Sequence, residues 1–346
     1  MSLFSYNCKI HSLLLGLLFS ACSVTSYISL NVKLPANIVL PPEIQRVIVV
    51  NNMAELSDQE EFHIYSFDAD YKHFSMPLDS LSTVLCTSLW QTLEREDFFD
   101  GIALWRPLPG HDLQLPKDEK INEILRLTET DAVIALDYMH YNTRLNLGRD
   151  EDSIMLKAVY DVHCYALFTV YPADERLKKT SVTVDDTARW ITYGFNIQSV
   201  INEMPYLDAA LLDAINRTGE IAGNKLIPHW KTEYRKYYSA FSSDLKKAAQ
   251  HIVSNDWESA FSIWTKLYEK KNSTLLTRAK CAANMALYYE LNNRLDEAME
   301  WAMQAEKEFQ ASGSHSDEAF YMDDYRFRLE LRKKEMHLLD IQEKKY

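Results

Sequence analysis

The sequence has few of the residues, and none of the short motifs, that usually mark a catalytic or cofactor-binding centre. Only 8 of its 346 residues are glycine, and no glycine-rich segment precedes a helical pattern, so a phosphate-binding loop is not expected. The spacings GxSxG, HExxH and CxxC do not occur, and the 10 histidines are scattered without two at metal-ligand spacing. We therefore predict a protein that is not an enzyme and holds no metal or cofactor.

Positive charge is also scarce. The chain carries 37 lysines and arginines against 50 aspartates and glutamates, which gives a formal net charge of -13. Surfaces that bind nucleic acid or anionic lipid need a positive field, and no long basic run supplies one. The composition therefore excludes a general nucleic-acid-binding protein, while the chain is long enough for two domains with separate cores.

Cysteines beyond the first 22 residues are few and odd in number. Cys86, Cys164 and Cys281 each lie inside an apolar, periodic stretch of sequence. A disulfide framework would require an even, regularly spaced set. We expect three buried free thiols, which pack as small apolar side chains.

Long apolar runs are absent except at the start of the chain. Lys9 precedes the apolar residues 13–19, a pattern that predicts a secretory signal peptide too short to span a bilayer. Cys22 follows two small residues, so residues 19–22 resemble the bacterial lipobox, with Phe19 where leucine is usual. The resemblance implies cleavage before Cys22 and lipid attachment to its thiol; a plain signal peptide is the alternative.

These features predict where in the cell the protein is located. Residues 1–21 form the signal peptide and residues 22–26 a lipidated tether, so membrane contact is expected through lipid on Cys22. Residues 23–27 lack the acidic side chains that often direct such lipoproteins to the cell surface. We expect an outer-membrane lipoprotein that faces the periplasm.

The patterns from residue 27 to residue 228 predict an α+β domain with a mixed sheet. Residues 46–51 are a continuous β-branched run, typical of a strand that is buried on both faces. An amphipathic helix follows Pro77, and a second short buried strand is expected at residues 132–136. Residues 158–170 then alternate apolar and polar side chains, which indicates an antiparallel strand with one wetter face.

Two segments between residues 245 and 309 follow one template. Its positions are Ala248, Asn255, Trp257, Ala260, Trp264 and Leu267, which recur 38 residues later as Ala286, Asn293, Leu295, Ala298, Ala302 and Ala305. Small residues let two antiparallel helices pack closely, and asparagine tolerates a left-handed turn between them. The template resembles the tetratricopeptide repeat, whose period is about 34 residues. We predict an all-α, tetratricopeptide-like region over residues 244–346.

The resemblance also implies a concave face formed by the first helix of each pair. The residues assigned to it are Leu245, Ala249, Ile252, Val253, Ala283, Leu287 and Leu291. Two repeats are fewer than the three or so that bury a continuous core. Other parts of the chain must therefore cover the apolar surface at the two ends of the repeats. We expect residues 316–341, with Phe320 and Tyr325 among the contacts, to form a closing helix that partly covers this face.

The segment 229–243, between the two predicted domains, is the richest in aromatic and basic side chains. The candidate patch comprises His229, Trp230, Tyr234, Arg235, Tyr237 and Tyr238. Arginine and tyrosine side chains could hold a sugar or an acidic peptide. We favour the alternative, in which these residues join the two domains.

The chain as a whole resembles an uncharacterised family of Bacteroidales-type lipoproteins. The residues that carry the resemblance are 34–36, 47–51, 226–230, 235–238, 256–257 and 284–286. The resemblance implies architecture and location but no activity. We therefore expect a non-enzymatic envelope lipoprotein that scaffolds or binds a protein partner through helical repeats. An envelope hydrolase of glycan or peptidoglycan, with carboxylates brought together in the α+β domain, is the alternative.

Overall fold

The computed structural model describes residues 25–53, 63–65, 78–106, 117–149, 154–240, 242–313 and 316–343. The predicted signal peptide and Cys22 lie outside these residues. The chain divides into two compact units. Unit 1 comprises Met1–Val32 and Lys231–His337, and unit 2 comprises Lys33–Trp230 and Leu338–Tyr346. Unit 1 is therefore built from both ends of the chain, and each unit is described by itself.

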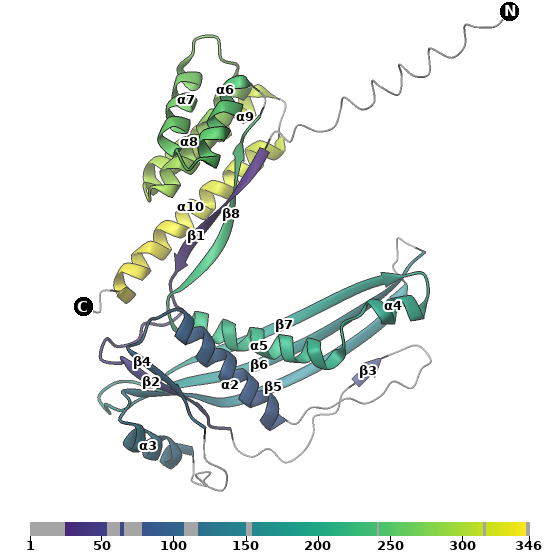
Figure 1. Ribbon diagram of the computed structural model, residues 1–346, viewed down its shortest axis with the longest axis vertical. Helices are drawn as coiled ribbons and strands as arrows, with labels where there is room; N and C mark the ends of the chain where they lie inside the picture. The colour runs from purple at the N-terminus through teal and green to yellow at the C-terminus, as the bar shows by residue number, and fades with distance from the viewer. Residues whose placement is uncertain are drawn as a thin grey trace, which may run out of the picture. The chain divides into compact units, whose positions relative to one another are not determined.

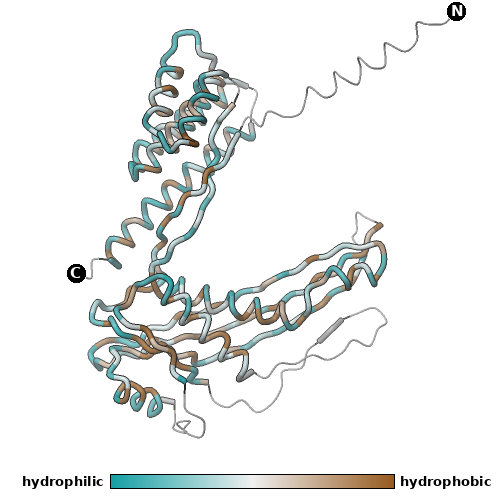
Figure 2. The backbone as a smooth tube through the Cα atoms, in the orientation of Figure 1, coloured by the Kyte–Doolittle hydropathy of each residue, from teal (hydrophilic) through white to brown (hydrophobic). Residues whose placement is uncertain are grey.

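Unit 2 is organised around a mixed sheet (Figure 1). Its strands are β2 (Arg46–Asn51), β3 (His63–Tyr65), β4 (Gly101–Leu104), β5 (Ala132–Arg149), β6 (Leu156–Pro172) and β7 (Thr180–Gly194). The order is β4-β2-β5-β6-β7, with β3 also paired to β5. β2 is parallel to β4 and β5, whereas β6 is antiparallel to β5 and β7. The mixed-sheet prediction for the N-terminal part is confirmed, and Figure 2 shows the hydrophobic run along β2.

β5 is much longer than the strand predicted at residues 132–136. It runs for 18 residues, to Arg149, because a bulge interrupts its alternation without ending it. The pairing with β6 shifts register between Leu136 and Tyr138. Before the bulge Ile134 lies in the main core, and after it Met139 does. The extra residue, Asp137, reverses which face each later side chain occupies.

Helices cover the two faces of the sheet unequally. α2 (Leu78–Arg95) and α5 (Leu207–Leu226) pack over the core face, with α4 (Ile197–Glu203) near β7. The amphipathic helix predicted after Pro77 is α2, and its leucines Leu81, Leu85, Leu89 and Leu93 are fully buried. α3 (Lys117–Thr128) covers the opposite face only over the start of β5 and β2, through Ile121 and Ile124.

Unit 1 begins with a strand pair that local patterns did not reveal. β1 (Thr25–Leu34) pairs with β8 (His229–Tyr238) in a two-stranded sheet. Ser26 hydrogen-bonds Ser239 at 2.7 Å, and Thr232 hydrogen-bonds Asn31 at 2.9 Å, so the strands run in opposite directions. We predicted that the residues of β1 belong to the α+β domain and that the residues of β8 connect the two domains. The structure instead pairs them with each other.

The rest of unit 1 is helical, as predicted. The helices are α6 (Ser243–Val253), α7 (Trp257–Glu269), α8 (Leu275–Leu291), α9 (Leu295–Ser312) and α10 (Ser316–Glu343). Asn255 and Asn293 adopt the left-handed conformation at φ 57 and 55 between the paired helices, as the template requires. The recurring alanines Ala248, Ala260, Ala286, Ala298, Ala302 and Ala305 are fully buried. None of the described helices is both long and apolar enough to cross a membrane.

The end of α10 contributes to unit 2. Gln342 is 5% exposed and bonds both backbone groups of Ala36, 306 residues earlier in the chain. Its amide oxygen accepts from the Ala36 N–H at 2.9 Å, and its Nε2 donates to the Ala36 carbonyl at 2.9 Å. A single side chain therefore satisfies a backbone segment that no strand pairs.

Candidate functional site

The predicted aromatic and basic patch lies on one strand, β8, but not on one surface. Arg235, Tyr237 and Tyr238 are buried, whereas Trp230 is 59% and Tyr234 is 66% exposed. Successive side chains of a strand point to opposite faces, which separates the buried Arg235 and Tyr237 from the exposed Trp230 and Tyr234. Tyr238, at the end of β8, is buried as well. The buried members hold β8 in unit 1 and leave no continuous ligand patch.

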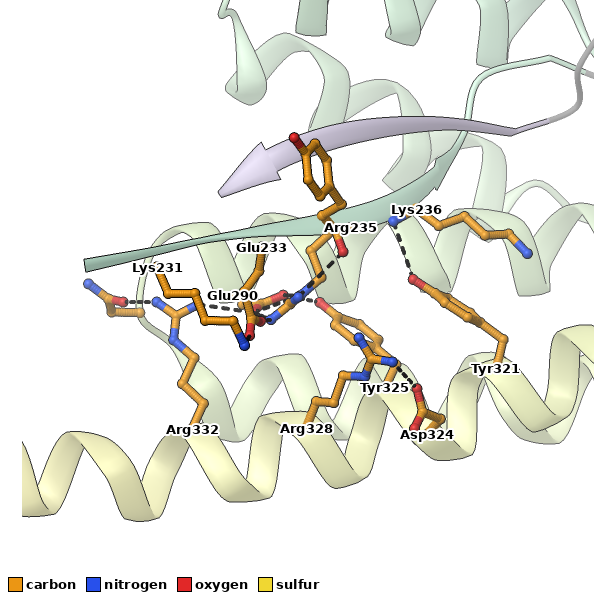
Figure 3. A network of polar contacts seen from close by, with 12 residues as sticks. Lys231, Glu233, Arg235, Lys236, Glu290, Tyr321, Asp324, Tyr325, Arg328 and Arg332 are labelled. Carbon is orange, nitrogen blue, oxygen red and sulfur yellow. Dashed lines mark hydrogen bonds and ion pairs between the residues drawn. The ribbon is translucent and has the colours of Figure 1, made fainter. Parts of the chain in front are cut away.

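Arg235 belongs to a buried ionic centre that surrounds Glu290 of α8 (Figure 3). Glu290 is fully buried. The Nε of Arg235 lies 3.1 and 3.0 Å from its two carboxylate oxygens, and Nη2 lies 2.9 Å from Oε1. Two groups of α10 complete the shell: the Tyr325 hydroxyl donates to Oε2 at 2.6 Å, and Arg332 Nη1 donates to Oε1 at 2.9 Å. One carboxylate thus joins β8, α8 and α10.

The protonation states at this centre follow from burial and charge. Burial alone would lower the pKa of Arg235, but the hydrogen bonds and negative charge of Glu290 outweigh burial and raise it. Burial raises the pKa of Tyr325 well above its ordinary value, and the Glu290 charge adds to the effect. Arg235 therefore stays charged and Tyr325 stays a neutral donor. A second acid, Glu233, lies 2.7 Å from Arg235.

The contacts of Glu290 are those of a structural ion-pair network and not of a reactive site. A carboxylate offers about four acceptor positions, and Arg235, Tyr325 and Arg332 occupy both of its oxygens. Little acceptor capacity is left for a substrate. Removing one partner from such a buried network leaves an unpaired charge in a medium that solvates it poorly, so the centre fixes the position of β8 on the helices.

Asn284, also on α8, forms a second set of hydrogen bonds that fixes the position of β8. It is fully buried. Its Oδ1 accepts from the Tyr238 backbone N–H at 2.8 Å and its Nδ2 donates to the Tyr238 carbonyl at 2.9 Å. The side-chain amide therefore replaces a neighbouring strand. Sequence reasoning missed the roles of Asn284 and Glu290, although polar residues inside the apolar run of α8 were a usable signal, because such residues must be buried with partners.

The predicted concave face is mostly filled by the protein itself. Leu245, Ile252, Ala283 and Leu287 are buried, Ala249 and Leu291 are partly buried, and Val253 is 85% exposed. Ala283 shares one apolar cluster with residues of α10 that include Ala319, Met322, Tyr325 and Leu329. The residues therefore do not line one open groove.

The outward side of α10 exposes apolar side chains in unit 1. Met322, Tyr325 and Leu329 point into the core. On the other side, Phe320 is 76%, Phe327 is 65% and Leu331 is 46% exposed. The prediction that Phe320 contributes to the closing contact is therefore wrong, because Phe320 lies on the opposite side of the helix from Tyr325. An open depression of about 370 Å³ on this surface is lined by Phe320, Asp323, Asp324, Arg326, Phe327 and Glu330.

In unit 2, the half of the sheet that α3 leaves uncovered presents a polar face. Arg189 of β7 forks onto Asp161 of β6 at 2.6 and 2.9 Å. His163 Nε2 lies 2.7 Å from Asp185 Oδ1. The register places Asp161 opposite Arg189 and Asp185 opposite Tyr165, so the two acids are four positions apart along the strands. Each is paired with a basic side chain.

The three described cysteines are buried free thiols, as predicted. Burial raises the pKa of Cys86 and Cys281 to about 12 and that of Cys164 to about 11. Neutral, inaccessible thiols are poor nucleophiles and poor metal ligands. Within the ranges that the structure describes, no group of three or more His, Cys, Asp or Glu side chains could hold a metal ion.

Family comparison identifies the chain at the level of its domains. Residues 44–238, more than half of the chain, match a family model described as a domain of unknown function (DUF8603), and the protein belongs to this family. Residues 246–331 match a second model, also described as a domain of unknown function (DUF6340). The first match covers the sheet of unit 2 and extends through β8, and the second runs from α6 into the first part of α10. The prediction of an uncharacterised family is confirmed.

Two solved structures show distant similarities to this chain. A neuraminyllactose-binding hemagglutinin homolog from Helicobacter pylori is 12% identical, with a TM-score of 0.28, and the match covers 62% of this chain and 92% of that one. A Xanthomonas campestris protein of the family-model DUF330 is 10% identical, with a TM-score of 0.23, over 56% and 90% of the two chains. At these scores neither similarity carries an argument. The comparison with curated proteins gives no match.

Proposed function

We propose that this protein is a non-enzymatic lipoprotein of the bacterial cell envelope that binds or scaffolds a protein partner through its C-terminal helical region. The single observation that carries the proposal is the exposed apolar side of α10, where Phe320 and Phe327 are 76% and 65% exposed. A contiguous apolar surface with a polar rim is typical of a protein-interaction site. Phenylalanine is also enriched at the centres of such interfaces.

The helices beneath this surface support a tetratricopeptide-like scaffold. The pairs α6/α7 and α8/α9 each turn at a left-handed asparagine, Asn255 or Asn293. The helices touch through buried alanines, which permit close packing. Helix pairs of this kind bind or scaffold and do not catalyse. Because α10 fills part of the inner side, the proposed contact surface is the outer side of α10.

Position-specific photo-cross-linking in intact envelopes tests the proposal. A photoreactive phenylalanine analogue at position 327 should give a discrete adduct with a protein. The same analogue at position 195, where Phe195 is 74% exposed in unit 2, should not give that adduct. Equal adducts from both positions, or no adduct from position 327, would contradict the proposal.

The arrangement of acids in unit 2 favours this reading over a hydrolase. Asp161 and Asp185 are offset by about 13 Å along the strands, whereas paired glycosidase carboxylates stand about 5–9.5 Å apart. No nucleophile on a sharp turn accompanies the His163–Asp185 pair among the described contacts of this face. Cleavage of purified peptidoglycan that disappears in Asp161→Asn or Asp185→Asn would restore the enzymatic alternative.

The proposed anchor and location have separate tests. Mass spectrometry of the isolated protein should find Cys22 as the first residue with diacylglycerol on its thiol, and Cys22→Ser should release the protein from membranes. Several acyl chains hold a protein firmly, whereas one gives marginal binding. Protease added to intact cells should leave an outer-membrane, periplasm-facing protein uncut, and digestion would contradict that orientation.

A further inference from the structure

One end of the long sheet in unit 2 exposes a group of apolar side chains. Figure 1 shows α4 at this end, where β7 finishes and β6 begins. The exposed apolar residues here, which we call the apolar tip, are Ile154, Tyr193, Phe195, Ile197, Ile201 and Tyr206. Ile154 and Tyr206 are each 85% exposed. A grouped apolar surface of this kind is typical of a contact site.

The apolar tip carries no charge along most of its length. Residues 190–202 contain no charged side chain, although 25% of the residues in the chain are charged. Arg189 and Glu203 stand at the two ends of this run. Lys157 lies at its margin, with the ammonium 5.9 Å from the centre of the Tyr193 ring. An uncharged surface with charges only at its margin loses little solvation when it enters hydrocarbon.

The polar groups between β7 and the end of α4 bond one another. Asn196 Oδ1 accepts from the Ser199 backbone N–H at 2.8 Å, and the Asn196 backbone N–H donates to Ser199 Oγ at 3.3 Å. Along α4, Gln198 Nε2 donates to Asn202 Oδ1 at 2.8 Å. Backbone and amide groups without partners are costly to bury in lipid, and these groups already have partners within the protein.

These contacts favour lipid over protein as the partner of the apolar tip. Protein interfaces form about one hydrogen bond per 100–200 Å², whereas the amides of Gln198 and Asn202 are occupied with each other. Hydrocarbon needs neither a hydrogen-bonding group nor a complementary shape. Tyrosine is enriched where a protein meets the boundary of a bilayer, and the tip exposes Tyr193 and Tyr206 beside Phe195.

We propose that the apolar tip of unit 2 inserts into the surface of a phospholipid bilayer. Phe195, Ile197 and Ile201 enter the boundary between head groups and acyl chains, about 5–10 Å deep. Tyr193 and Tyr206 lie at the level of the head groups. The contact needs no basic patch, in agreement with the net charge of -13. The inference goes beyond the proposed function and does not depend on the partner surface of α10.

Charge near the apolar tip selects the kind of head group. Acidic residues stand at positions 150–152, shortly before Ile154, and the whole chain is acidic. Anionic lipid attracts basic segments and repels acidic ones, so a zwitterionic bilayer is the expected surface. A few apolar side chains give a weak and reversible attachment, which a second anchor such as lipid on Cys22 strengthens.

Photo-cross-linking of the purified full-length chain to phosphatidylcholine vesicles tests the contact directly. A photoreactive phenylalanine analogue at position 195 should form a covalent adduct with one phospholipid molecule, which mass spectrometry detects. The matched control is position 327, because Phe327 is also exposed but lies in unit 1. No phospholipid adduct from position 195, or equal adducts from both positions, overturns the proposal.

Sedimentation with the same vesicles measures the strength of the contact. The chain used begins at residue 22 and carries Cys22→Ser, so that neither a leader nor an acyl chain contributes. Phe195→Asp should weaken binding by at least about tenfold, because the phenylalanine side chain no longer leaves water. Phe327→Asp should leave binding unchanged, and far-UV circular dichroism checks the fold of both variants. Binding that Phe195→Asp does not weaken, or that high salt abolishes, overturns the proposal.

Cross-linking in intact envelopes separates this inference from the proposed function. A protein adduct from position 195 without a phospholipid adduct would show that a protein covers the apolar tip, and the inference would be wrong. A missing protein adduct at position 327 contradicts the proposed function and leaves lipid contact at position 195 unaffected. A protein adduct at position 327 with no lipid adduct at position 195 has the opposite meaning.

Discussion

The two units differ in where they place their ion pairs. Unit 1 buries the Glu290 carboxylate with Arg235 and leaves Phe327 exposed on α10. Unit 2 fills its core with apolar side chains and leaves the ion pair of Arg189 with Asp161 on an open sheet face. The same kind of interaction therefore has different consequences in each unit. A pair in solvent is easily replaced by water, whereas a buried pair must be complete.

The difference indicates how each unit specifies its structure. Apolar burial is non-directional, so the sheet of unit 2 obtains its order from strand register and helix spacing. β8 of unit 1 is placed by directional contacts with Glu290 and Asn284, which fit only one position of the strand. Four predictions, from the largest expected effect to the smallest, test this contrast.

Glu290→Gln should destabilise unit 1 by about 3–5 kcal/mol, the cost of leaving a buried ion pair incomplete. Arg235 and Arg332 would lose the charge they surround while their side chains stay 4% and 14% exposed. Hydrogen exchange should show loss of protection in β8 and α8. Asp185→Asn on the open face of unit 2, where that side chain is 70% exposed, should change stability by less than about 0.5 kcal/mol. Equal effects would remove the contrast between the units.

Gly219→Ala should destabilise unit 2 by about 1–3 kcal/mol through overpacking. An added Cβ would lie 2.7 Å from Ser88 Cβ and 2.8 Å from the Leu85 carbonyl oxygen, where α5 approaches α2. The matched control is Gly148→Ala, whose added Cβ meets nothing within 4 Å. Urea unfolding followed by exchange in β5 and β6 measures both variants. If Gly219→Ala is tolerated as well as Gly148→Ala, close helix spacing does not order this unit.

Cys86 should make unit 2 less stable at alkaline pH. Burial raises the pKa of its thiol from 9.0 to about 12. The folded state keeps a proton that the unfolded state releases, so this contribution is complete below pH 9.0 and is lost as the pH rises towards 12. The slope reaches about 1.4 kcal/mol per pH unit for one proton. Urea unfolding below pH 9.0 and about one unit above it should show a smaller pH dependence for Cys86→Ala than for wild type. An identical slope would contradict burial of this thiol.

Asn255→Ala should cost about 1 kcal/mol, because an ordinary side chain is strained at its φ of 57. Asn255→Gly should be close to neutral. Asn293→Ala should cost more than Asn255→Ala, because Asn293 also accepts a hydrogen bond from Arg332 at 2.9 Å. Thermal unfolding of the three variants measures the order. An equal loss from both alanine variants would show that Arg332 contributes nothing through Asn293.

The features that the sequence predicted correctly are those with local physical causes. The amphipathic helix α2, the alternation along β6 and the left-handed asparagines of the helix turns each depend on residues close together in the chain. The continuation of β5 could not be predicted in the same way, because the Asp137 bulge reverses the alternation by which a strand is recognised. The prediction that Phe320 lies on the covered side of α10 failed for a related reason. The helix carries apolar residues on two sides, so the pattern does not show which side is covered.

The candidate site was harder to predict because its partners are distant in sequence. Arg235 was identified as a candidate, but Glu290 lies 55 residues away, and nothing in the local pattern joins them. The pairing of β1 with β8 was missed for the same reason, because about 200 residues separate the two strands. Asn284 and Glu290 were not predicted as site residues, although both are polar residues in a largely apolar helix. The sequence also does not indicate which groups would satisfy them.

The pairing of the two chain ends has a consequence for the order of folding during synthesis. β1 is made early, but its partner β8 follows about 200 residues later, and Gln342 reaches Ala36 only when the last turns of α10 exist. Contacts of such long separation close large loops and form slowly. During synthesis β1 therefore remains an unpaired edge strand, a state prone to wrong pairing. In a nascent chain that stops before residue 229, β1 should therefore be available for binding by a chaperone. This should hold whether or not the sheet of unit 2 has already formed.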